Sequence, residues 1–234
     1  VVGERYADTL EGVTSRYETL HLQSSGNPDS VYRSGSLAAA PGGSAEPDHY
    51  RYDPRGLSVP KLEATLTGSH LLDQTLVLAP AGGKLIYHSD PFEQDTEVSG
   101  FFKFAAWIAI DQPDTDFLMS IYDIGPDGSS MFLTEQHMRA RYRTSLRTEK
   151  LIDTQAPLRY DFDRFFFVSR LIRKDHRLRL VVRANEGLGW QKNYNSGKPV
   201  VDETMADART VTVRLFHDAA HPSALSIPIG QPKG

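Results

Sequence analysis

Serine and histidine are the residue types to consider first, because a serine nucleophile needs a histidine base within hydrogen-bonding reach. A nucleophile elbow has the pattern Gly-x-Ser-x-Gly and lies on a sharp turn between a strand and a helix. No serine here has that pattern, and the nearest one, Ser44, lies in a run of small residues that ends in Glu46. The chain has no cysteine to supply a thiolate. The sequence therefore predicts no catalytic residue. A triad formed without the motif is the weaker alternative, since triads are defined by geometry.

Metal ligands are the next group to consider. His217 and His221 are four residues apart, but Pro222 and the alternating pattern nearby favour a turn between strands over a helix that would align the two rings. Clustered carboxylates suit calcium, although aspartate is also common in hairpin turns and the EF-hand spacing is absent. The carboxylates in question are Asp111, Asp114, Asp116, Asp123 and Asp127. We predict no metal and no cofactor, and keep calcium as the alternative.

Alternating arginines raise the question of phosphate binding. They are Arg139, Arg141 and Arg143 on one predicted strand and Arg177, Arg179 and Arg183 on another. The net charge of −4 does not favour a nucleic acid, and pairing with Asp and Glu on a half-buried face accounts for the arginines more simply. No apolar run approaches the ~18 residues of a membrane span. We therefore expect neither nucleic acid nor a membrane as partner.

Aromatic residues could bind a sugar ring by stacking. Trp107 lies within a predicted strand and is better accounted for by packing, whereas Trp190 and Tyr194 lie in a predicted loop. These two keep the possibility of contact with a ligand or a neighbouring domain. A free-standing carbohydrate-binding module is accordingly the alternative function.

The elements that must position these residues are strands. Residues 84–143 contain three long runs of aromatic and β-branched residues, separated by clusters of Asp, Gly and Pro, as in consecutive antiparallel strands. In the central run one face is uniformly apolar, with Phe102, Phe104, Ala106, Ile108 and Ile110. Such a face needs a second layer to cover it. We predict an all-β jelly-roll sandwich of two packed, mainly antiparallel sheets with about ten strands.

One domain over residues 1–234 is the preferred organisation, with residues 1–15 as a polar lead-in. Residues 34–47 are predicted to be a surface loop rather than a linker. In the long stretch that ends at Gly83 and in the loop 186–207, the apolar residues do not recur at a regular spacing. Long irregular loops of this kind are often functional or form interfaces. The chain begins with Val1 rather than methionine, which we interpret as a segment of a longer protein. The sequence does not choose between cytoplasm and export.

An ordered set of short motifs resembles the C-terminal domain of the X-Pro dipeptidyl-peptidases and CocE/NonD-type hydrolases. The similarity runs from about Arg16 to Ile229 and depends on the order of the motifs rather than on any one of them. The motifs are Tyr52-Asp53-Pro54 with Val59-Pro60, Ser89-Asp90-Pro91 with Val98-Ser99-Gly100, Asp114-Thr115-Asp116-Phe117, Tyr122-Asp123, Asp127-Gly128, Arg139 with Arg141-Tyr142-Arg143, His176-Arg177-Leu178-Arg179, Asn193-x-Asn195-Ser196-Gly197 and His221-Pro222-Ser223.

This resemblance implies a galactose-binding-like jelly roll that follows an α/β-hydrolase catalytic domain bearing the Ser, Asp and His. None of those three has a counterpart in this chain. Members of the family hydrolyse X-Pro peptides, amino-acid esters, β-lactam side-chain amides and acyl esters. The resemblance places the segment from Asp53 to Leu72 nearest the active-site mouth. Its sequence after Tyr-Asp-Pro, Arg55 to Glu63, departs from the family pattern, so peptidase and esterase both stay open for the parent protein.

The predicted function is that of a non-catalytic jelly-roll domain, which packs on the catalytic domain of the same parent protein and shapes its substrate entrance. Formation of a homo-oligomer is a further possibility. The candidate residues for the substrate entrance or the domain interface are Asp53, Pro54, Pro60, Leu66, His70, Leu71, Trp190, Asn193 and Asn195.

Overall fold

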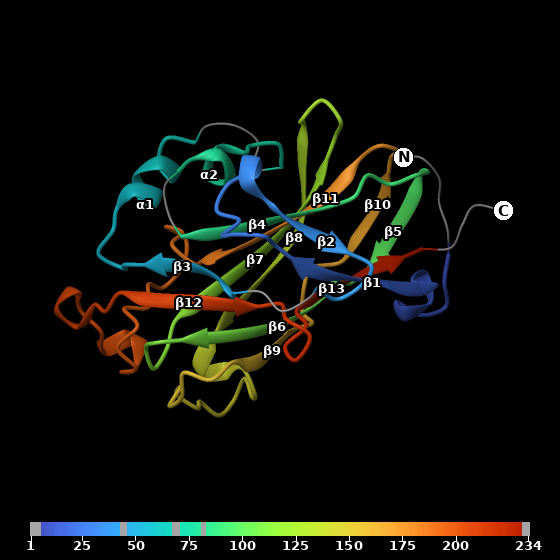
Figure 1. The fold of residues 1–234 in the computed structure, drawn as a ribbon. Coiled ribbons are helices and arrows are strands. Elements are labelled where there is room, and N and C mark those ends of the chain that lie inside the picture. The colour runs from blue at the N-terminus through green and yellow to red at the C-terminus, as the bar shows by residue number, and fades with distance from the viewer. Residues whose placement is uncertain (1–5, 43–45, 67–70, 81–82, 231–234) are drawn as a thin grey trace.

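The computed structural model describes residues 6–42, 46–66, 71–80 and 83–230, which fold into two layers of strands joined by long loops (Figure 1). The first layer consists of β3 (Asp48–Tyr52), β12 (Val211–Phe216), β6 (Lys103–Ile110), β13 (Ala224–Ile229) and β1 (Arg16–Gln23), with β9 (Leu158–Phe162) paired to β6. The second consists of β4 (Lys84–Ser89), β11 (Arg177–Ala184), β7 (Asp116–Ile124) and β8 (Ser130–Arg139). The predicted all-β sandwich is confirmed.

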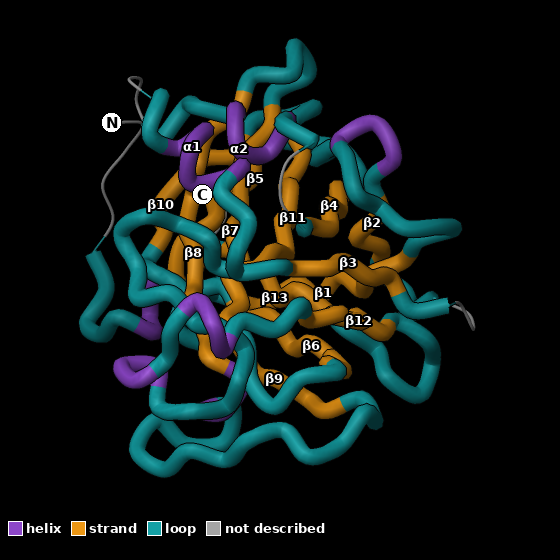
Figure 2. Tube along the Cα trace, turned by 90° about the vertical axis from the view of Figure 1, so that its left-hand side faces the viewer, coloured by secondary structure: helices purple, strands orange, loops and turns teal. Residues whose placement is uncertain are grey.

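The two layers belong to one continuous hydrogen-bonded path rather than to two separate sheets (Figure 2). β2 (Gly35–Ala38) links them, because it runs antiparallel to β1 and parallel to β4. β5 (Thr96–Gly100) pairs with β10 (Val168–Ile172) and, through Val98 and Ile229, with β13. The strand pairs are otherwise antiparallel among the described residues, in agreement with the mainly antiparallel prediction.

The core lies between the layers and follows the alternation seen in the sequence. Side chains at every second position of β6, β7 and β11 point inward and join one apolar cluster. They are Phe104, Ala106, Ile108 and Ile110 of β6, Phe117, Met119 and Ile121 of β7, and Leu178, Leu180 and Val182 of β11. Removing water from this apolar surface is the main source of stability in a sandwich of this kind.

Three predictions about the elements need correction. Residues 34–47 are not only loop, because they contain β2, whose Leu37 belongs to the core. The stretch that ends at Gly83 contains two short helices, α1 (Ser58–Glu63) and α2 (Thr75–Leu78). Thirteen strands, rather than about ten, are present in the described residues.

Gly35 shows why the sequence pattern does not reveal β2. A β-carbon at this position would lie 2.5 Å from a ring carbon of Tyr87 on β4, so only glycine allows the two strands to approach. Gly35 therefore marks a close approach of the backbone to Tyr87 and to the carbonyl of Gln23. Short 3₁₀ helices occupy several of the loops: η1 (Glu11–Val13), η2 (Val31–Arg33), η3 (Ala140–Tyr142), η4 (Val200–Asp202) and η5 (Met205–Asp207).

The predicted arginine faces are partly correct. β8 ends at Arg139, and the chain then turns into η3, so Arg141 and Arg143 do not continue a strand face. Within the described residues, pairing with acids is observed for two of the six arginines: Arg139 binds Asp116 through two hydrogen bonds of 2.8 and 2.9 Å, and buried Arg141 binds Asp114 at 2.8 Å.

Candidate functional site

The candidate site lies on the outer face of the second layer, where α1 and α2 pack against the strands (Figure 1). All nine residues of β7 are buried, which requires a cover on the outer face as well as a core on the inner one. Val77 of α2 supplies part of this cover, in a second apolar cluster with Ile86, Tyr122, Ile124 and Val181. The irregular segment that the sequence marked as functional is therefore held against the sheet.

Gln74 joins the start of α2 to two places on the sheet. Its side-chain amide donates to the carbonyl of Gly128 at 3.0 Å, and its side-chain oxygen accepts from Nη1 of Arg179 at 2.9 Å. The nitrogen Nε of Arg179 donates to Nε2 of His88 at 2.8 Å. Arg179 is almost fully buried, and no carboxylate pairs with it among the described residues.

His88 must therefore be neutral in this arrangement, since a protonated ring nitrogen cannot accept a hydrogen bond. Burial, together with the charges of Arg179 and Arg177, lowers the pKa of His88 from 6.5 to about 4. The neutral imidazole and the neutral amide of Gln74 thus satisfy a buried guanidinium, and this holds α2 against the sheet.

A groove of 260 Å³ opens between the helical segment and the loop that carries Trp190. Its floor is formed by apolar and aromatic side chains of the sheet, including Leu118, Tyr122 and Phe132. The indole of Trp190 stacks on the imidazole of His137, with ring centroids 3.8 Å apart and planes inclined by 31°. Nε2 of His137 lies 3.3 Å from a carboxylate oxygen of Glu135, so one side of the stack is polar.

Two segments more than a hundred residues apart in the sequence form this one surface. The carboxylate of Glu63, the last residue of α1, accepts a hydrogen bond of 2.8 Å from the backbone nitrogen of Leu188. Nζ of Lys192 donates to the carbonyl of Pro54 at 2.6 Å. The segment after Tyr-Asp-Pro and the Trp190 loop, predicted separately as functional, are thus neighbours.

The first candidate residues lie at the start of this surface. The carboxylate of Asp53 accepts two hydrogen bonds of 2.8 Å from the guanidinium of Arg55, and these lower the pKa of Asp53. Pro54 is buried. Pro60 lies in the first turn of α1, where backbone N–H groups have no partner within the helix, so the missing N–H of proline costs no helical hydrogen bond.

Leu66 lines the groove together with Trp190, and Leu71 lies beside it with its carbonyl accepting from the nitrogen of Phe132 at 2.7 Å. His70 lies outside the described residues. Six large apolar side chains of the two segments are each more than half exposed, and we call them the apolar rim: Leu57, Leu71, Leu72, Leu78, Leu188 and Trp190. Large exposed apolar groups on two segments that lie against each other are typical of a surface that another protein covers.

Asn193 and Asn195 occupy a different position, because both are buried. The amide of Asn193 donates to Asp114 and to Asp116, each at 2.8 Å. Asn195 has a positive φ of 64°, which asparagine tolerates better than most residues, and its amide donates to the carbonyl of Arg209 at 2.7 Å. These two residues hold the base of the Trp190 loop.

One cluster contains the three residue types of a catalytic triad without its geometry. Oγ of Ser24 donates to Asp48 at 2.7 Å and lies 3.2 Å from Nε2 of His217, and the same ring nitrogen lies 3.2 Å from the other oxygen of Asp48. In a triad the serine and the carboxylate bind opposite ring nitrogens. Tyr87 also donates to Asp48, at 2.6 Å, and the cluster joins four elements of the fold.

Three of the five aspartates considered for calcium bind arginine, asparagine or histidine side chains, and the other two, Asp111 and Asp127, accept hydrogen bonds from the backbone nitrogens of Thr212 and Ser129 at 2.8 and 3.0 Å. Asp114 and Asp116 bind Arg141, Arg139 and Asn193 as described above, and Asp123 binds Arg170 and His176 at 2.8 and 2.7 Å. In the described ranges no three His, Cys, Asp or Glu side chains are grouped so that they could hold a metal ion. None of the described helices is long and apolar enough to cross a membrane.

Comparison with known proteins identifies the family. Residues 19–226 match the family described as the X-Pro dipeptidyl-peptidase C-terminal non-catalytic domain. The chain belongs to this family. The match covers most of the chain and includes both segments that form the groove, so the resemblance inferred from the ordered motifs is confirmed.

Relatives of this non-catalytic domain are parts of larger proteins. Cocaine esterase of Rhodococcus sp. (strain MB1 Bresler) is 26% identical over 216 residues, which are 91% of this chain and 37% of the esterase. An aminopeptidase of a marine sediment archaeon, Thaumarchaeota archaeon, has the same fold, with a TM-score of 0.77, 20% identity and coverage of 93% of this chain and 37% of its own. An α-amino acid ester hydrolase also shares the fold, with a TM-score of 0.71, 17% identity and coverage of 91% and 36%. The chain thus spans little more than a third of the length of these proteins.

Several residues of the groove gave no signal in the sequence. Glu63, Gln74 and His137 are ordinary polar residues, and their partners Leu188, Arg179 and Trp190 are distant in the sequence. The length of the Trp190 loop, its aromatic residues and the motif Asn193-x-Asn195-Ser196-Gly197 indicated that this loop was unusual. A family motif did mark the segment after Asp53, although not the helices that it forms.

Proposed function

We propose that this non-catalytic domain packs on a serine-hydrolase catalytic domain of the same parent protein through the groove and the apolar rim. The carrying observation is that the α1–α2 segment and the Trp190 loop are joined by hydrogen bonds beside the groove, and that these two segments carry six large apolar side chains that are more than half exposed. A surface of this kind is costly to leave in water and is stabilised when a partner covers it. The domain thereby forms part of the wall of the substrate entrance.

The position of the Tyr-Asp-Pro segment supports this assignment. By the family resemblance this segment approaches the active-site mouth, and here it continues directly into α1 and the groove. The Asp53–Arg55 pair lies at the exposed start of the segment. We propose that the Asp53–Arg55 pair contributes to the substrate entrance. Asn193 and Asn195 contribute indirectly, because they fix the base of the Trp190 loop.

The chemistry in the parent protein is proposed to be acyl transfer to a serine followed by transfer to water. The substrate is an ester, an amide or an X-Pro peptide. Relatives named as a cocaine esterase, an aminopeptidase and an α-amino acid ester hydrolase span this range. The 234-residue chain by itself is expected to be inert.

The test compares the isolated chain with the polypeptide encoded by its complete gene. The longer polypeptide should contain a Gly-x-Ser-x-Gly elbow, hydrolyse p-nitrophenyl acetate or Gly-Pro-p-nitroanilide and take up a fluorophosphonate label. The isolated chain should do none of these. Turnover and labelling of the isolated chain, or a complete gene without a catalytic domain, would contradict the proposal.

Carbohydrate binding is the second candidate, and the stack of Trp190 on His137 beside the polar group of Glu135 is the observation that favours it. A glycan array should then show saturable binding that is lost in Trp190→Ala and kept in Trp107→Phe. Failure of every glycan to bind would remove this candidate.

A further inference from the structure

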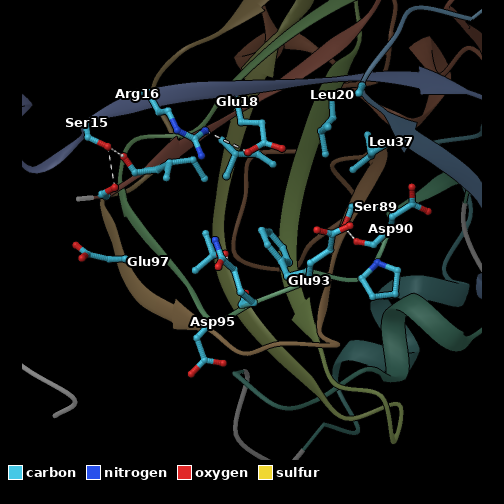
Figure 3. A pocket seen from close by; sticks show the side chains of 18 residues that line it. Ser15, Arg16, Glu18, Leu20, Leu37, Ser89, Asp90, Glu93, Asp95 and Glu97 are labelled. Atoms are coloured by element: carbon cyan, nitrogen blue, oxygen red, sulfur yellow. Dashed lines mark hydrogen bonds and ion pairs between the residues drawn. The ribbon is translucent and has the colours of Figure 1, made fainter. Parts of the chain in front are cut away.

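A second and larger opening lies on another side of the fold. Between β1 and the loop that joins β4 to β5 is a cleft of 710 Å³, which we call the acidic cleft (Figure 3). One wall is β1, with Arg16, Glu18 and Leu20, and the opposite wall is the segment 89–97. The lining residues include members of β1, β5 and β13, and these strands lie away from α1 and α2 (Figure 1). Its volume is within the range of sites that bind small molecules or peptide segments.

The residues that line the cleft carry a net negative charge, unlike the rest of the chain. Five carboxylates and one guanidinium line it, a net formal charge of −4. The whole chain also has a net charge of −4, so the remaining residues together carry none. The carboxylates are Glu18, Asp90, Glu93, Asp95 and Glu97.

Part of this charge is balanced and part is not. Glu18 lies 3.3 Å from Arg16, and Asp95 lies 2.6 Å from Arg173. The carboxylates of Asp90 and Glu93 have no ion-pair partner among the described residues, and both are exposed at the mouth. Carboxylates on the walls of a cleft attract a cationic group, and the low-dielectric floor strengthens that field.

The floor of the cleft is apolar. It is formed by Leu20, Leu37, Ile227 and Ile229, whose side chains belong to the core or pack against it. The cleft is therefore a place where the interior of the sandwich opens to solvent between its two layers. A ligand that fits both floor and mouth must carry apolar and cationic groups together.

The neighbouring strand has a free edge that suits an extended chain. β1 pairs with β13 from Arg16 to His21, but with β2 only from His21 to Gln23. No strand of the described chain pairs with the second side of residues 16–20. Exposed edges of this kind accept peptides as added strands. The five residues span about 16 Å, at roughly 3.3 Å per residue.

We propose that the acidic cleft binds an extended peptide segment in which basic residues alternate with apolar ones, lying alongside β1. Successive side chains of an extended chain point to opposite sides. The apolar set then contacts Leu20, Leu37 and Ile227, and the basic set reaches Asp90 and Glu93. This site is independent of the proposed docking of a catalytic domain, because it uses none of the groove residues.

The test is a calorimetric titration of the 234-residue chain with the peptide acetyl-Arg-Leu-Arg-Leu-Arg-amide at low ionic strength. Saturable binding is expected, and the double variant Asp90→Asn/Glu93→Gln should weaken it about tenfold, as the loss of two exposed ion pairs predicts. The matched control Asp153→Asn/Asp202→Asn removes two exposed carboxylates outside the cleft and should leave the affinity unchanged. Unfolding curves of both double variants should match that of the wild type.

Two comparison ligands and a spectrum complete the test. The acidic peptide acetyl-Glu-Leu-Glu-Leu-Glu-amide should not bind, and argininamide should bind much more weakly than the basic peptide. Amide shifts in the NMR spectrum should change at residues 16–20 and 90–97. Equal binding of both peptides, equal affinity for argininamide, or shifts confined to other residues would overturn the proposal.

Discussion

At the scale of single residues, His88 has the clearest physical consequence. Its ring accepts a hydrogen bond from the buried Arg179, and its pKa is lowered to about 4. Protonation would remove that acceptor and place a second positive charge beside the guanidinium. Protonation of this imidazole should therefore lower the stability of the folded chain.

A pH dependence of stability follows from this shift. Between pH 6.5 and about 4 the unfolded chain binds a proton at His88 and the folded chain does not, so stability falls as the pH falls through this window. The loss amounts to about 2 kcal/mol after allowance for screening by water at the partly exposed side of the ring. Urea unfolding of the wild type and of His88→Gln between pH 7.5 and 4 should show a shallower pH dependence in the variant. His49→Gln, an exposed control, should keep the slope of the wild type.

Trp190 is a second residue with a measurable role. It is more than half exposed and stacks on His137, so Trp190→Ala should lower the stability of the isolated chain by only about 1 kcal/mol. Its fluorescence should be accessible to acrylamide in the isolated chain and protected in the parent protein. Equal quenching in both would contradict the proposed interface. Trp107→Phe isolates the signal of Trp190 for this measurement.

Residue types alone could not distinguish the exposed residues of the Trp190 loop from the buried residues that anchor it. Trp190 does lie in a loop, as the polar neighbours and the lack of alternation around it predict. Asn193 is a candidate of the same loop, but its amide lies between Asp114 and Asp116 and is buried. Those partners are almost eighty residues away in the sequence, and no local pattern reports such a distant contact.

At the scale of elements, the loop that carries Trp190 is fixed by hydrogen bonds rather than by regular structure. Asn193 and Asn195 anchor it, and the carboxylate of Glu203 accepts from the backbone of Tyr194 and Ser196 at 2.8 and 3.0 Å. A loop held in this way presents its outer residues in a defined place. The loop can therefore form a wall of the groove.

Removal of the Asn193 amide should disturb this loop. Asn193→Ala removes one donor from each of two carboxylate oxygens, which keep only their hydrogen bonds to Arg141 and Arg139, so we expect a loss of about 2 to 3 kcal/mol in the free energy of unfolding. Hydrogen exchange should accelerate at residues 186–207 before the strands are affected. Asn27→Ala is the control, because its side-chain oxygen binds an exposed backbone nitrogen, that of His49, and its loss should cost less.

Elements with a strong period were predictable, and those without one were not. β1, β6 and β11 have side chains that alternate between two faces, and this alternation can be read from the sequence. α1 and α2 have only six and four residues, and no side chain caps their N-termini. Helices so short are not stable alone. They exist because Val77, Gln74 and Glu63 bind them to the rest of the chain, which a local sequence pattern cannot show.

At the scale of the whole molecule, the two openings differ in kind. The groove is lined by apolar and polar side chains, and the segments beside it carry exposed leucines, whereas the cleft contains the net negative charge of the chain. Large apolar contact is typical of a lasting interface, and charge on an apolar floor is typical of a reversible one. We therefore assign the groove to the neighbouring domain and the cleft to an exchangeable segment.

The apolar rim should behave differently in the isolated chain and in the parent protein, and this difference can be measured. In the isolated chain the rim faces water, so Leu72→Asp/Leu188→Asp should reduce dye binding and self-association without lowering the free energy of unfolding, because both side chains are more than half exposed. In the parent protein the same change places two charges in a covered surface, which is costly. It should separate a single unfolding transition into two and reduce ester or X-Pro amide hydrolysis at least tenfold. The control Leu146→Asp/Phe166→Asp alters two similarly exposed residues outside the rim and should leave hydrolysis unchanged. If both double variants behaved alike in the parent protein, the groove and rim would not be the interface.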